Sequence, residues 1–342
     1  MKKTQSYTAH EQEGILLNAN ENTKGLSAKI RAEIAEAIAG VALNRYPDNS
    51  ETELLEAYAK VIGVTKDNLL AGNGSDQMLG YLIGSFLGKG KKLYTLSPDF
   101  SMYDYYAASY EADVFRFACE EDGSFDVQAF IACGKENGAD MIMFSNPNNP
   151  TGHLLSLPVI EQILQAFAGI PVVIDEAYIE FSGSDSSVSL IGKYADLYVT
   201  RTLSKAWGLA GIRTGFLVSS ASNMEPLKKS FVPYALNSVS MKIASTVLKH
   251  AAEIAQMTQK TIAERERMYE LVRECKKAQF FPSAANFLYG RSSQKDQLIA
   301  SLKEKNIVIR NYAGGPYFRI TVGTKEENEI VCSVLKQFEE AL

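Results

Sequence analysis

The chain has 342 residues, 46% of them hydrophobic, and its 35 basic and 40 acidic residues give a net charge of −5. This apolar content can form a large core, which argues against a disordered chain, and the length allows a large domain with a smaller companion. Basic residues are spread along the chain rather than clustered, so we expect no nucleic-acid or membrane partner and instead a small-molecule ligand.

Cysteines and histidines are few and widely spaced. The cysteines are Cys119, Cys133, Cys275 and Cys332, and the histidines are His10, His153 and His250. Without paired motifs they argue against a disulfide framework, a zinc site and a histidine-based triad, so we expect no metal and reduced thiols. No apolar run reaches membrane-spanning length and the first residues lack a secretory hydrophobic segment, which favours a cytoplasmic protein.

The first predicted element is an amphipathic helix over residues 27–40. Ser27 is a suitable N-cap, apolar residues follow at helical spacing, and Gly40 ends the pattern. The residues before it form an arm. We expect this arm and helix, residues 1–40, to pack with the small domain.

Strand candidates then alternate with helical patterns. They lie near residues 92–96, 113–117, 141–145, 171–175, 197–202 and 215–219. This alternation predicts an α/β fold with a mainly parallel sheet and helices on both faces. We assign residues 41–237 to this large domain.

The last third of the chain has a different pattern. A long helical pattern runs from Ser238 toward Lys277 and leads into residues 285–290. A helix is predicted near 294–305, strands at 307–312 and 317–322, and a final helix after Thr324. This is typical of a smaller α+β domain, residues 238–342. Its closure could carry Arg319 toward a bound ligand and exclude water.

Lys205 is the first candidate for chemistry. A lysine amine forms Schiff bases with carbonyl compounds once burial and a nearby positive charge keep it partly neutral. Lone lysines are usually solvated, but apolar and glycine residues follow this one and Arg213 lies eight positions later. With the residues below, the segment indicates a pyridoxal 5'-phosphate site.

Asp175 ends the apolar run 170–175, which is typical of a buried parallel strand. Ligands of open α/β sheets bind at that edge, and a carboxylate there can keep a pyridine nitrogen protonated. The alternative is a strand-end aspartate that caps a turn. Tyr178, three residues later, favours the cofactor interpretation because a phenol can share the proton of a ring oxygen.

Asn149 follows an earlier candidate strand, residues 140–144, and lies within a turn-like segment that ends at Gly152. Its amide could donate to the same ring oxygen. Alone, Asn-Pro and Pro-Thr-Gly are ordinary turn sequences. The order Asn149, Asp175, Lys205 is the informative part.

A cofactor phosphate needs backbone amides at a helix start, hydroxyls and a cation. The candidates are Gly74, Ser75, Asp76, Thr202, Ser204 and Arg213. The glycine loop at 72–74 matches neither the dinucleotide fingerprint nor a Walker loop, so the loop alone is weak evidence.

These motifs together resemble the aspartate-aminotransferase-like enzymes of fold type I, class II, and most closely the histidinol-phosphate aminotransferases. The similar segments, in order, are residues 17–22, 44–48, 72–76, 146–152, 175–178, 201–205, 282–287 and 319–324. The resemblance covers nearly the whole chain.

The resemblance implies a role for each matching residue. Lys205 would bind the cofactor covalently, Asp175 would pair with the ring nitrogen, and Tyr178 and Asn149 would bind the ring oxygen. The phosphate candidates above would surround the phosphate. Tyr46 would reach the neighbouring subunit's cofactor, which implies a homodimer, and Asn20, Asn149, Arg310 and Arg319 would bind substrate.

Some positions depart from the family pattern. A Pro-Thr-Tyr segment usually stacks a tyrosine on the cofactor ring, whereas this chain has Pro98, Asp99 and Phe100. Phe100 would keep the stacking and lose the hydroxyl.

The implied reaction is a ping-pong transamination between an amino donor and an oxo-acid acceptor. The resemblance favours histidinol phosphate with 2-oxoglutarate, in histidine biosynthesis. Aromatic amino acids are an alternative, because the two arginines could hold a carboxylate and Tyr103, Tyr106 and Phe287 could line the pocket. A threonine-phosphate decarboxylase and a ligand-binding module of a regulator are less favoured alternatives.

Overall fold

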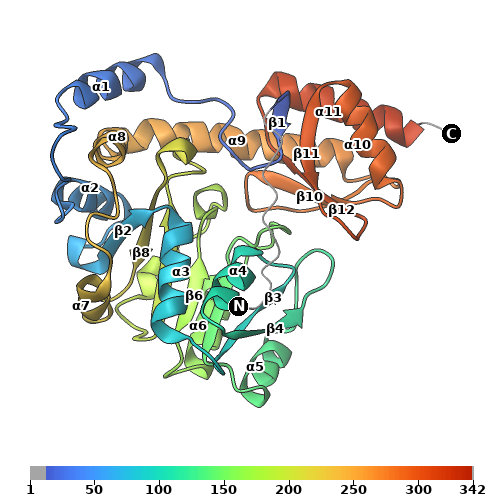
Figure 1. Ribbon diagram of the computed structural model, residues 1–342. Coiled ribbons are helices and arrows are strands. Elements are labelled where there is room, and N and C mark those ends of the chain that lie inside the picture. Colours follow the sequence, from blue (N-terminus) through green and yellow to red (C-terminus); the bar gives the residue numbers. More distant parts are fainter. Residues whose placement is uncertain (1–12, 341–342) are drawn as a thin grey trace.

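The computed structural model describes residues 13–340, which form two sheets with helices packed around them (Figure 1). The larger sheet has the strand order β2-β8-β7-β6-β5-β3-β4. Its strands are β2 (Leu69–Asn73), β3 (Lys92–Ser97), β4 (Asp113–Ala118), β5 (Met141–Ser145), β6 (Val172–Asp175), β7 (Leu197–Thr202) and β8 (Thr214–Val218). β8 pairs antiparallel with β2 and β7 and the other pairs are parallel, so the predicted mainly parallel sheet is confirmed.

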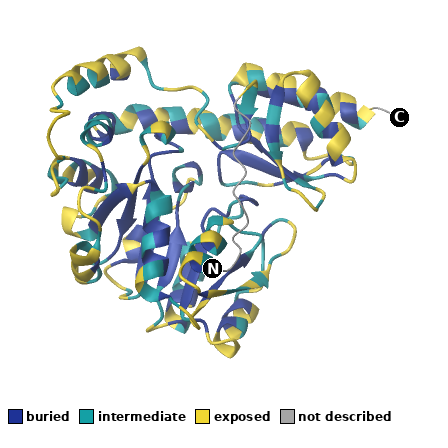
Figure 2. Ribbon diagram, in the orientation of Figure 1, coloured by how far each residue is buried: buried dark blue, intermediate teal, exposed yellow. Residues whose placement is uncertain are grey.

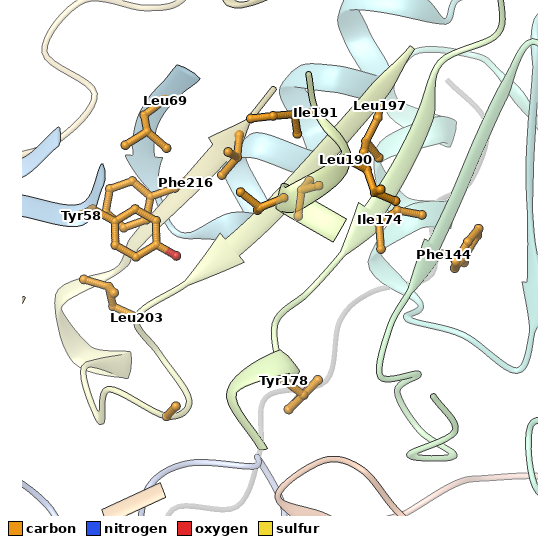
Figure 3. Packing of buried hydrophobic residues seen from close by; sticks show 14 of the residues in the cluster. Tyr58, Leu69, Phe144, Ile174, Tyr178, Leu190, Ile191, Leu197, Leu203 and Phe216 are labelled. Atoms are coloured by element: carbon orange, nitrogen blue, oxygen red, sulfur yellow. The ribbon is translucent and has the colours of Figure 1, made fainter. Parts of the chain in front are cut away.

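Helices cover both faces of this sheet because alternate strand residues point to opposite sides. In β5, Ile142 and Phe144 join one buried cluster and Met141 and Met143 join another. The first cluster is covered by α2 (Thr52–Ile62), α5 (Val127–Glu136), α6 (Leu157–Ala166) and α8 (Ser238–Leu248), and Figure 3 shows part of it. The second is covered by α3 (Ser75–Phe86), α4 (Met102–Ser109) and α7 (Ala221–Ser230). The strands are the buried centre of this layered region (Figure 2).

The smaller sheet has the order β1-β11-β12-β10-β9. Its strands are β1 (Ile15–Leu17), β9 (Gln279–Phe281), β10 (Phe287–Arg291), β11 (Ile307–Asn311) and β12 (Tyr317–Thr321). They share an apolar cluster with α9 (Ala251–Val272), α10 (Lys295–Glu304) and α11 (Lys325–Glu340). β1 pairs in parallel with β11, so the residues directly after Leu17 start from the edge of this sheet.

One predicted element is divided in two. The helical pattern from Ser238 forms α8 and α9, with a break at Lys249 and His250. His250 lies near α1 (Ala28–Ala39), and its Nε2 is 2.6 Å from a carboxylate oxygen of Glu33. The prediction of one long helix was wrong because apolar periodicity continues through the bend and does not show it.

The predicted division of the chain into residues 1–40, 41–237 and 238–342 stays a prediction. α1 packs on α8, and both Ile30 of α1 and Val247 of α8 belong to the cluster that packs on the larger sheet. β1, by contrast, belongs to the smaller sheet. Within residues 13–340, no helix combines the length and hydrophobicity that a membrane span requires.

Candidate active site

The candidate residues meet at the edge where the central parallel strands end. β5 ends at Ser145, β6 at Asp175 and β7 at Thr202, and the antiparallel β8 begins directly after Arg213. Parallel strands place their carboxyl ends at one edge, so the segments that carry Asn149, Tyr178 and Lys205 all leave the sheet there.

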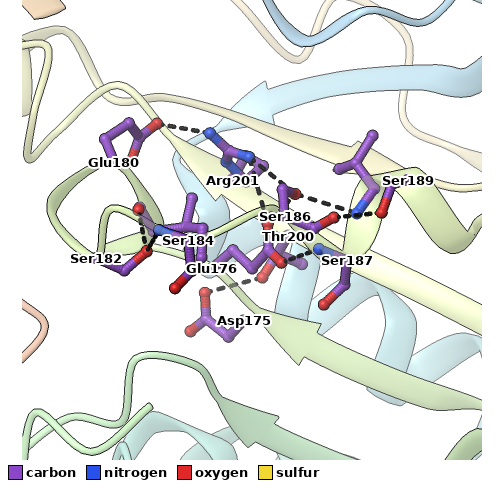
Figure 4. Close-up of polar contacts among 12 residues, drawn as sticks. Asp175, Glu176, Glu180, Ser182, Ser184, Ser186, Ser187, Ser189, Thr200 and Arg201 are labelled. Carbon is purple, nitrogen blue, oxygen red and sulfur yellow. Dashed lines mark hydrogen bonds and ion pairs between the residues drawn. The ribbon is translucent and has the colours of Figure 1, made fainter. Parts of the chain in front are cut away.

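Asp175 is a buried carboxylate with two hydroxyl donors. Thr200, its register partner on β7, donates to Oδ1 at 2.9 Å, and Tyr103 donates to Oδ2 at 3.2 Å (Figure 4 shows the Thr200 bond). Burial raises the pKa of Asp175 to about 6, while these donors oppose the rise. The carboxylate is therefore mainly ionised at neutral pH and can accept a further hydrogen bond.

Tyr103 contacts the site through Asp175. Its side chain is fully buried and its hydroxyl donates to Asp175, so its predicted place in the lining of the pocket stays a prediction. Tyr106, in the same proposed group, packs its ring on Gly80 of α3. The tyrosine spacing in this helix did not show which ring turns inward.

Tyr178 is linked to the N-terminal segment. Its hydroxyl accepts a hydrogen bond from Asn20 Nδ2 at 3.0 Å, and its ring packs edge-on against Phe287 with centroids 5.3 Å apart. Asn20 is itself fully buried and bonded to Thr321 and Asn286. Burial raises the pKa of Tyr178 to about 12, so its hydroxyl keeps its proton at neutral pH. The structure thus brings Asn20 to Tyr178.

Lys205 lies in the loop after β7, and its amine donates to the backbone oxygen of Ala19 at 2.8 Å. The amine is 6.0 Å from the centroid of the Tyr178 ring. Burial and the positive charge of Arg319 lower the pKa of Lys205 to about 8. A much larger neutral fraction than in a solvated lysine makes this amine able to bond a carbonyl carbon.

The start of α3 and the loop before β8 form an anion-binding arrangement. Gly74 precedes the helix with φ +86° and no side chain caps the first turn, so the amides of Ser75 and Asp76 remain available for a ligand. Arg213 Nη2 donates to Asp76 Oδ2 at 2.7 Å. Glycine suits this position because its φ lies in the left-handed region, and a Cβ there would also lie 2.7 Å from that nitrogen.

Two hydroxyl residues complete the arrangement. Thr202 and Ser204 are both buried, and the Ser204 amide donates to Thr202 Oγ1 at 3.1 Å. The charges of Asp76 and Arg213 both act on the Lys205 amine, which shows that these groups lie within electrostatic reach of one another. An anion site, a buried carboxylate and an activated amine at one sheet edge are the donor set that pyridoxal 5'-phosphate requires, so the residues fit this cofactor.

Arg319 on β12 reaches into the same site. Its guanidinium donates to Asn149 Oδ1 and, at 3.0 Å, to the backbone oxygen of Asn18, and it lies 5.0 Å from the Phe287 ring centroid. Its buried Nε has no hydrogen-bond partner among residues 13–340. Arg310 on β11 is the register partner of Arg319, so the two side chains lie on one face of the smaller sheet.

Phe100 and Tyr46 occupy two different settings. Phe100 is partly buried, and its ring is edge-on to Tyr103 at 5.7 Å, beside the tyrosine that binds Asp175. Tyr46 lies on the surface with 83% of its area exposed, stacked on Tyr234 at 5.0 Å. The structure therefore groups the predicted residues of one chain except Tyr46, which faces outward.

A buried ion-pair network behind Asp175 was not predicted. Arg201 on β7 binds Glu176 at 3.3 Å and Glu180 at 2.8 Å, and Ser186 and Ser187 complete the shell of Glu176 (Figure 4). Burial raises the pKa of Glu176 and the Arg201 charge lowers it. The network fixes the segment that follows Asp175. In the sequence, a basic residue near the end of a predicted strand was the signal that could have indicated this network.

Other unpredicted contacts come from backbone and amide groups. The backbone oxygens of Ala19 and Asn18 accept from Lys205 and Arg319, and backbone atoms carry no side-chain signature of a site. The Asn286 side-chain amide donates to the backbone oxygen of Asn20. Among residues 13–340, no group of three or more histidine, cysteine, aspartate or glutamate side chains is placed to hold a metal ion.

Comparison with known proteins agrees with this geometry. The family model "Aminotransferase class I and II" matches residues 12–335. The histidinol-phosphate aminotransferase of Clostridium kluyveri is 35% identical over 326 residues, or 94% of this chain and 92% of that protein. That of Pyrococcus furiosus is 36% identical over 326 residues, or 95% of this chain and 92% of that protein.

Solved structures show the same fold. The histidinol-phosphate aminotransferase from Clostridium acetobutylicum matches with a TM-score of 0.86 and 25% identity, covering 96% of this chain and 100% of that one. The enzyme from Sinorhizobium meliloti, in complex with pyridoxal-5'-phosphate, matches with a TM-score of 0.85 and 20% identity over 96% of this chain and 92% of that one. The chain is therefore a pyridoxal-phosphate-dependent enzyme of the class I and II aminotransferase family.

Proposed function

We propose that this chain transfers the amino group of histidinol phosphate to 2-oxoglutarate, as the names of its relatives indicate for those proteins. The observation that carries the substrate choice is the pairing of Arg310 with Arg319 on adjacent strands. Two arginines on one face of adjacent strands suit a phosphate dianion, and each can also hold a carboxylate of the second substrate.

We assign the cofactor contacts from the arrangement described above. Lys205 would hold pyridoxal 5'-phosphate covalently, Asp175 would bind the ring nitrogen, Tyr178 and Asn149 the ring oxygen, and Phe100 the ring face. The phosphate would lie among Gly74, Ser75, Asp76, Thr202, Ser204 and Arg213. When bound, the cofactor supplies an aldehyde carbon that takes up amines and a protonated ring that delocalises charge from the substrate Cα.

The chain's own residues would then move protons and orient the substrate. Lys205 Nζ, with a pKa of about 8, is suited to remove the proton from the substrate Cα near neutral pH. Asp175 keeps a negative charge beside the ring nitrogen, and Asn20 holds Tyr178 in place through its hydrogen bond. The amino-donor substrate and the oxo-acid acceptor would bind to this one site in turn.

We also propose a homodimer in which Tyr46 reaches the partner's site. Tyr46, Leu43, Val232 and Tyr234 form an exposed group of large apolar side chains on two segments that contact each other. Such a group favours burial against a second copy of the chain. Residues 41–237 and 238–342 would be the large and small domains, with the Arg319 to Asn149 bond made on closure.

The substrate assignment is tested by turnover of histidinol phosphate, phenylalanine and tyrosine with 2-oxoglutarate. We expect the highest kcat/KM for histidinol phosphate. Arg310→Met should lower that value about 10- to 100-fold, as expected for loss of a charged hydrogen bond. Arg291→Met is the matched control, because Arg291 lies on β10 and pairs with Glu121.

The alternatives give different results in the same assay. Turnover of phenylalanine and tyrosine without turnover of histidinol phosphate would replace the proposal by an aromatic aminotransferase. Release of carbon dioxide from threonine phosphate without an oxo acceptor would replace it by a decarboxylase.

A further inference from the structure

Asp99 follows β3 and bonds groups on two segments of the site. Its Oδ1 accepts hydrogen bonds from the Phe100 amide at 2.7 Å and from the Ser145 hydroxyl at 2.5 Å. Its Oδ2 accepts from the Ser145 amide at 3.2 Å. One carboxylate therefore holds the backbone of Phe100 and the last residue of β5.

Ser145 extends this contact to Asn149. While its hydroxyl donates to Asp99, the same oxygen accepts from the Asn149 amide at 2.9 Å. Asn149 in turn accepts a hydrogen bond from Arg319. A continuous chain of hydrogen bonds thus runs from Asp99 through Ser145 to Asn149.

The position of Asp99 in the sheet explains why a carboxylate is useful there. β3 and β5 pair through Leu93 and Tyr94 at their amino-terminal ends. At the carboxyl-terminal ends, the Asp99 side chain accepts the hydrogen bond of the Ser145 backbone amide, as a carbonyl group of a neighbouring strand would. The junction is then tied together where Phe100 and Asn149 leave the sheet.

We propose that Asp99 is a positioning residue that fixes Phe100 and Asn149 relative to each other, so that the ring face and ring oxygen of the cofactor are contacted by one rigid unit. The inference rests on the cofactor contacts proposed above. Phe100 has no hydroxyl through which its ring could be anchored, so its orientation depends on its backbone and packing. The Asp99 carboxylate supplies the backbone restraint.

The surroundings of Asp99 make these bonds hard to replace by water. Burial raises the pKa of this carboxyl to about 8 and the Asp175 charge adds to the rise, whereas the hydrogen bonds from Ser145 and Phe100 oppose it, so the carboxyl is mainly ionised only above pH 8. A buried group that loses its partners keeps the full desolvation cost. Breaking this contact should therefore loosen the junction.

The test is cofactor affinity of the apoenzyme, measured from the fluorescence of Trp207, the only tryptophan, which lies buried two residues after Lys205. Asp99→Asn keeps the shape of the side chain, but one of its acceptor oxygens becomes an amide donor that faces the donor groups of Phe100 and Ser145. At pH 9, where the wild-type carboxyl is mainly ionised, we expect the dissociation constant of Asp99→Asn for pyridoxal 5'-phosphate to be about tenfold or more above the wild-type value. If Asp99→Asn does not fold, Ser145→Ala takes its place in the test. It is a smaller change that removes the link to Asn149, and we expect a similar loss of affinity.

Asp140→Asn is the matched control. Asp140 joins the same two strands at their other ends, accepting from the Lys92 amide at 2.9 Å and from Lys91 Nζ at 2.8 Å. It should lower the melting temperature without changing cofactor affinity. Equal loss of affinity in both variants would show that Asp99 acts only on stability and would overturn the inference.

A double-mutant cycle with Phe100→Leu tests the route of the effect. If Asp99 acts through Phe100, Asp99→Asn should cost less affinity in the Phe100→Leu background than in the wild type. Simple addition of the two losses would contradict this. Wild-type protein that binds no cofactor would overturn the proposed function as well, whereas normal binding by Asp99→Asn would overturn the positioning role alone.

Discussion

At the scale of single residues, Lys205 shows how surroundings adjust a common side chain. Burial and Arg319 lower its pKa to about 8, so the neutral fraction of the amine rises as pH rises through 8. Covalent uptake of pyridoxal 5'-phosphate by the apoenzyme should accelerate over that range. Stopped-flow absorbance from pH 6.5 to 9.5 measures it.

Arg319→Met supplies the comparison for Lys205. Removing the positive charge raises the Lys205 pKa, so the rate profile should move to higher pH and the rate at pH 7.5 should fall. An unchanged profile would show that burial alone sets the reactivity of this amine.

Asp175 leads to a second pH prediction. Its pKa is about 6 and the Tyr103 hydrogen bond lowers it, so Tyr103→Phe should raise it. Because the ionised carboxylate binds the ring nitrogen, cofactor affinity should fall as pH falls through 6. The fall should begin at higher pH in Tyr103→Phe. Titrations of both apoproteins between pH 5 and 8 decide this, and superimposable curves would remove Tyr103 from the account.

At the scale of elements, the contact between β8 and the start of α3 sets the phosphate site. A Cβ at Gly215 would lie 2.1 Å from the Ser75 amide nitrogen. Gly215→Ala should therefore move the helix start, costing about 1–3 kcal/mol of unfolding free energy, as overpacking does, and weakening cofactor affinity. Chemical denaturation and cofactor titration measure the two effects.

Gly88→Ala is the control for this prediction. A Cβ at Gly88 meets no atom within 4 Å, so both stability and cofactor affinity should change little. If Gly215→Ala were as well tolerated as Gly88→Ala, close helix-to-strand packing would not be what forms the anion site.

The elements also show where sequence patterns suffice. The predicted strands from 92 to 219 and at 307–312 and 317–322 are confirmed, because apolar runs bounded by turn residues carry a strong signal. β1 and β9, with three residues each, are too short to show a period, and the break between α8 and α9 interrupts no apolar pattern. Strand ends brought Asn149, Asp175 and Lys205 to one edge, as expected from their order.

At the scale of the whole molecule, the predicted site is a junction between two sheets. The sequence motifs indicated the side chains that act on the cofactor, whereas Thr200, Asn286 and the carbonyl groups of Asn18 and Ala19 are brought in by tertiary contacts. Asn18, Ala19 and Asn286 lie in segments of the family resemblance, but their partners could not be predicted locally, because these hydrogen bonds span up to 301 positions of the chain.

The proposed dimer is a further property of the assembled molecule. When the Tyr46→Phe and Lys205→Ala variants are mixed, a mixed dimer has one subunit of each. One of its two sites then combines the intact Lys205 of the first variant with the intact Tyr46 of the second. If Tyr46 reaches the partner's site, that site should regain wild-type cofactor affinity, as measured by titration after subunit exchange. Mixed species with no better retention than the Tyr46→Phe dimer would contradict the shared site.

The central claim is that Lys205 binds pyridoxal 5'-phosphate covalently at the sheet edge. Borohydride treatment of the loaded protein, followed by peptide mass spectrometry, tests it most directly. The account predicts a cofactor adduct on the peptide that contains Lys205 and its loss in Lys205→Ala. An adduct on another lysine, or no adduct in the wild-type protein, would contradict it.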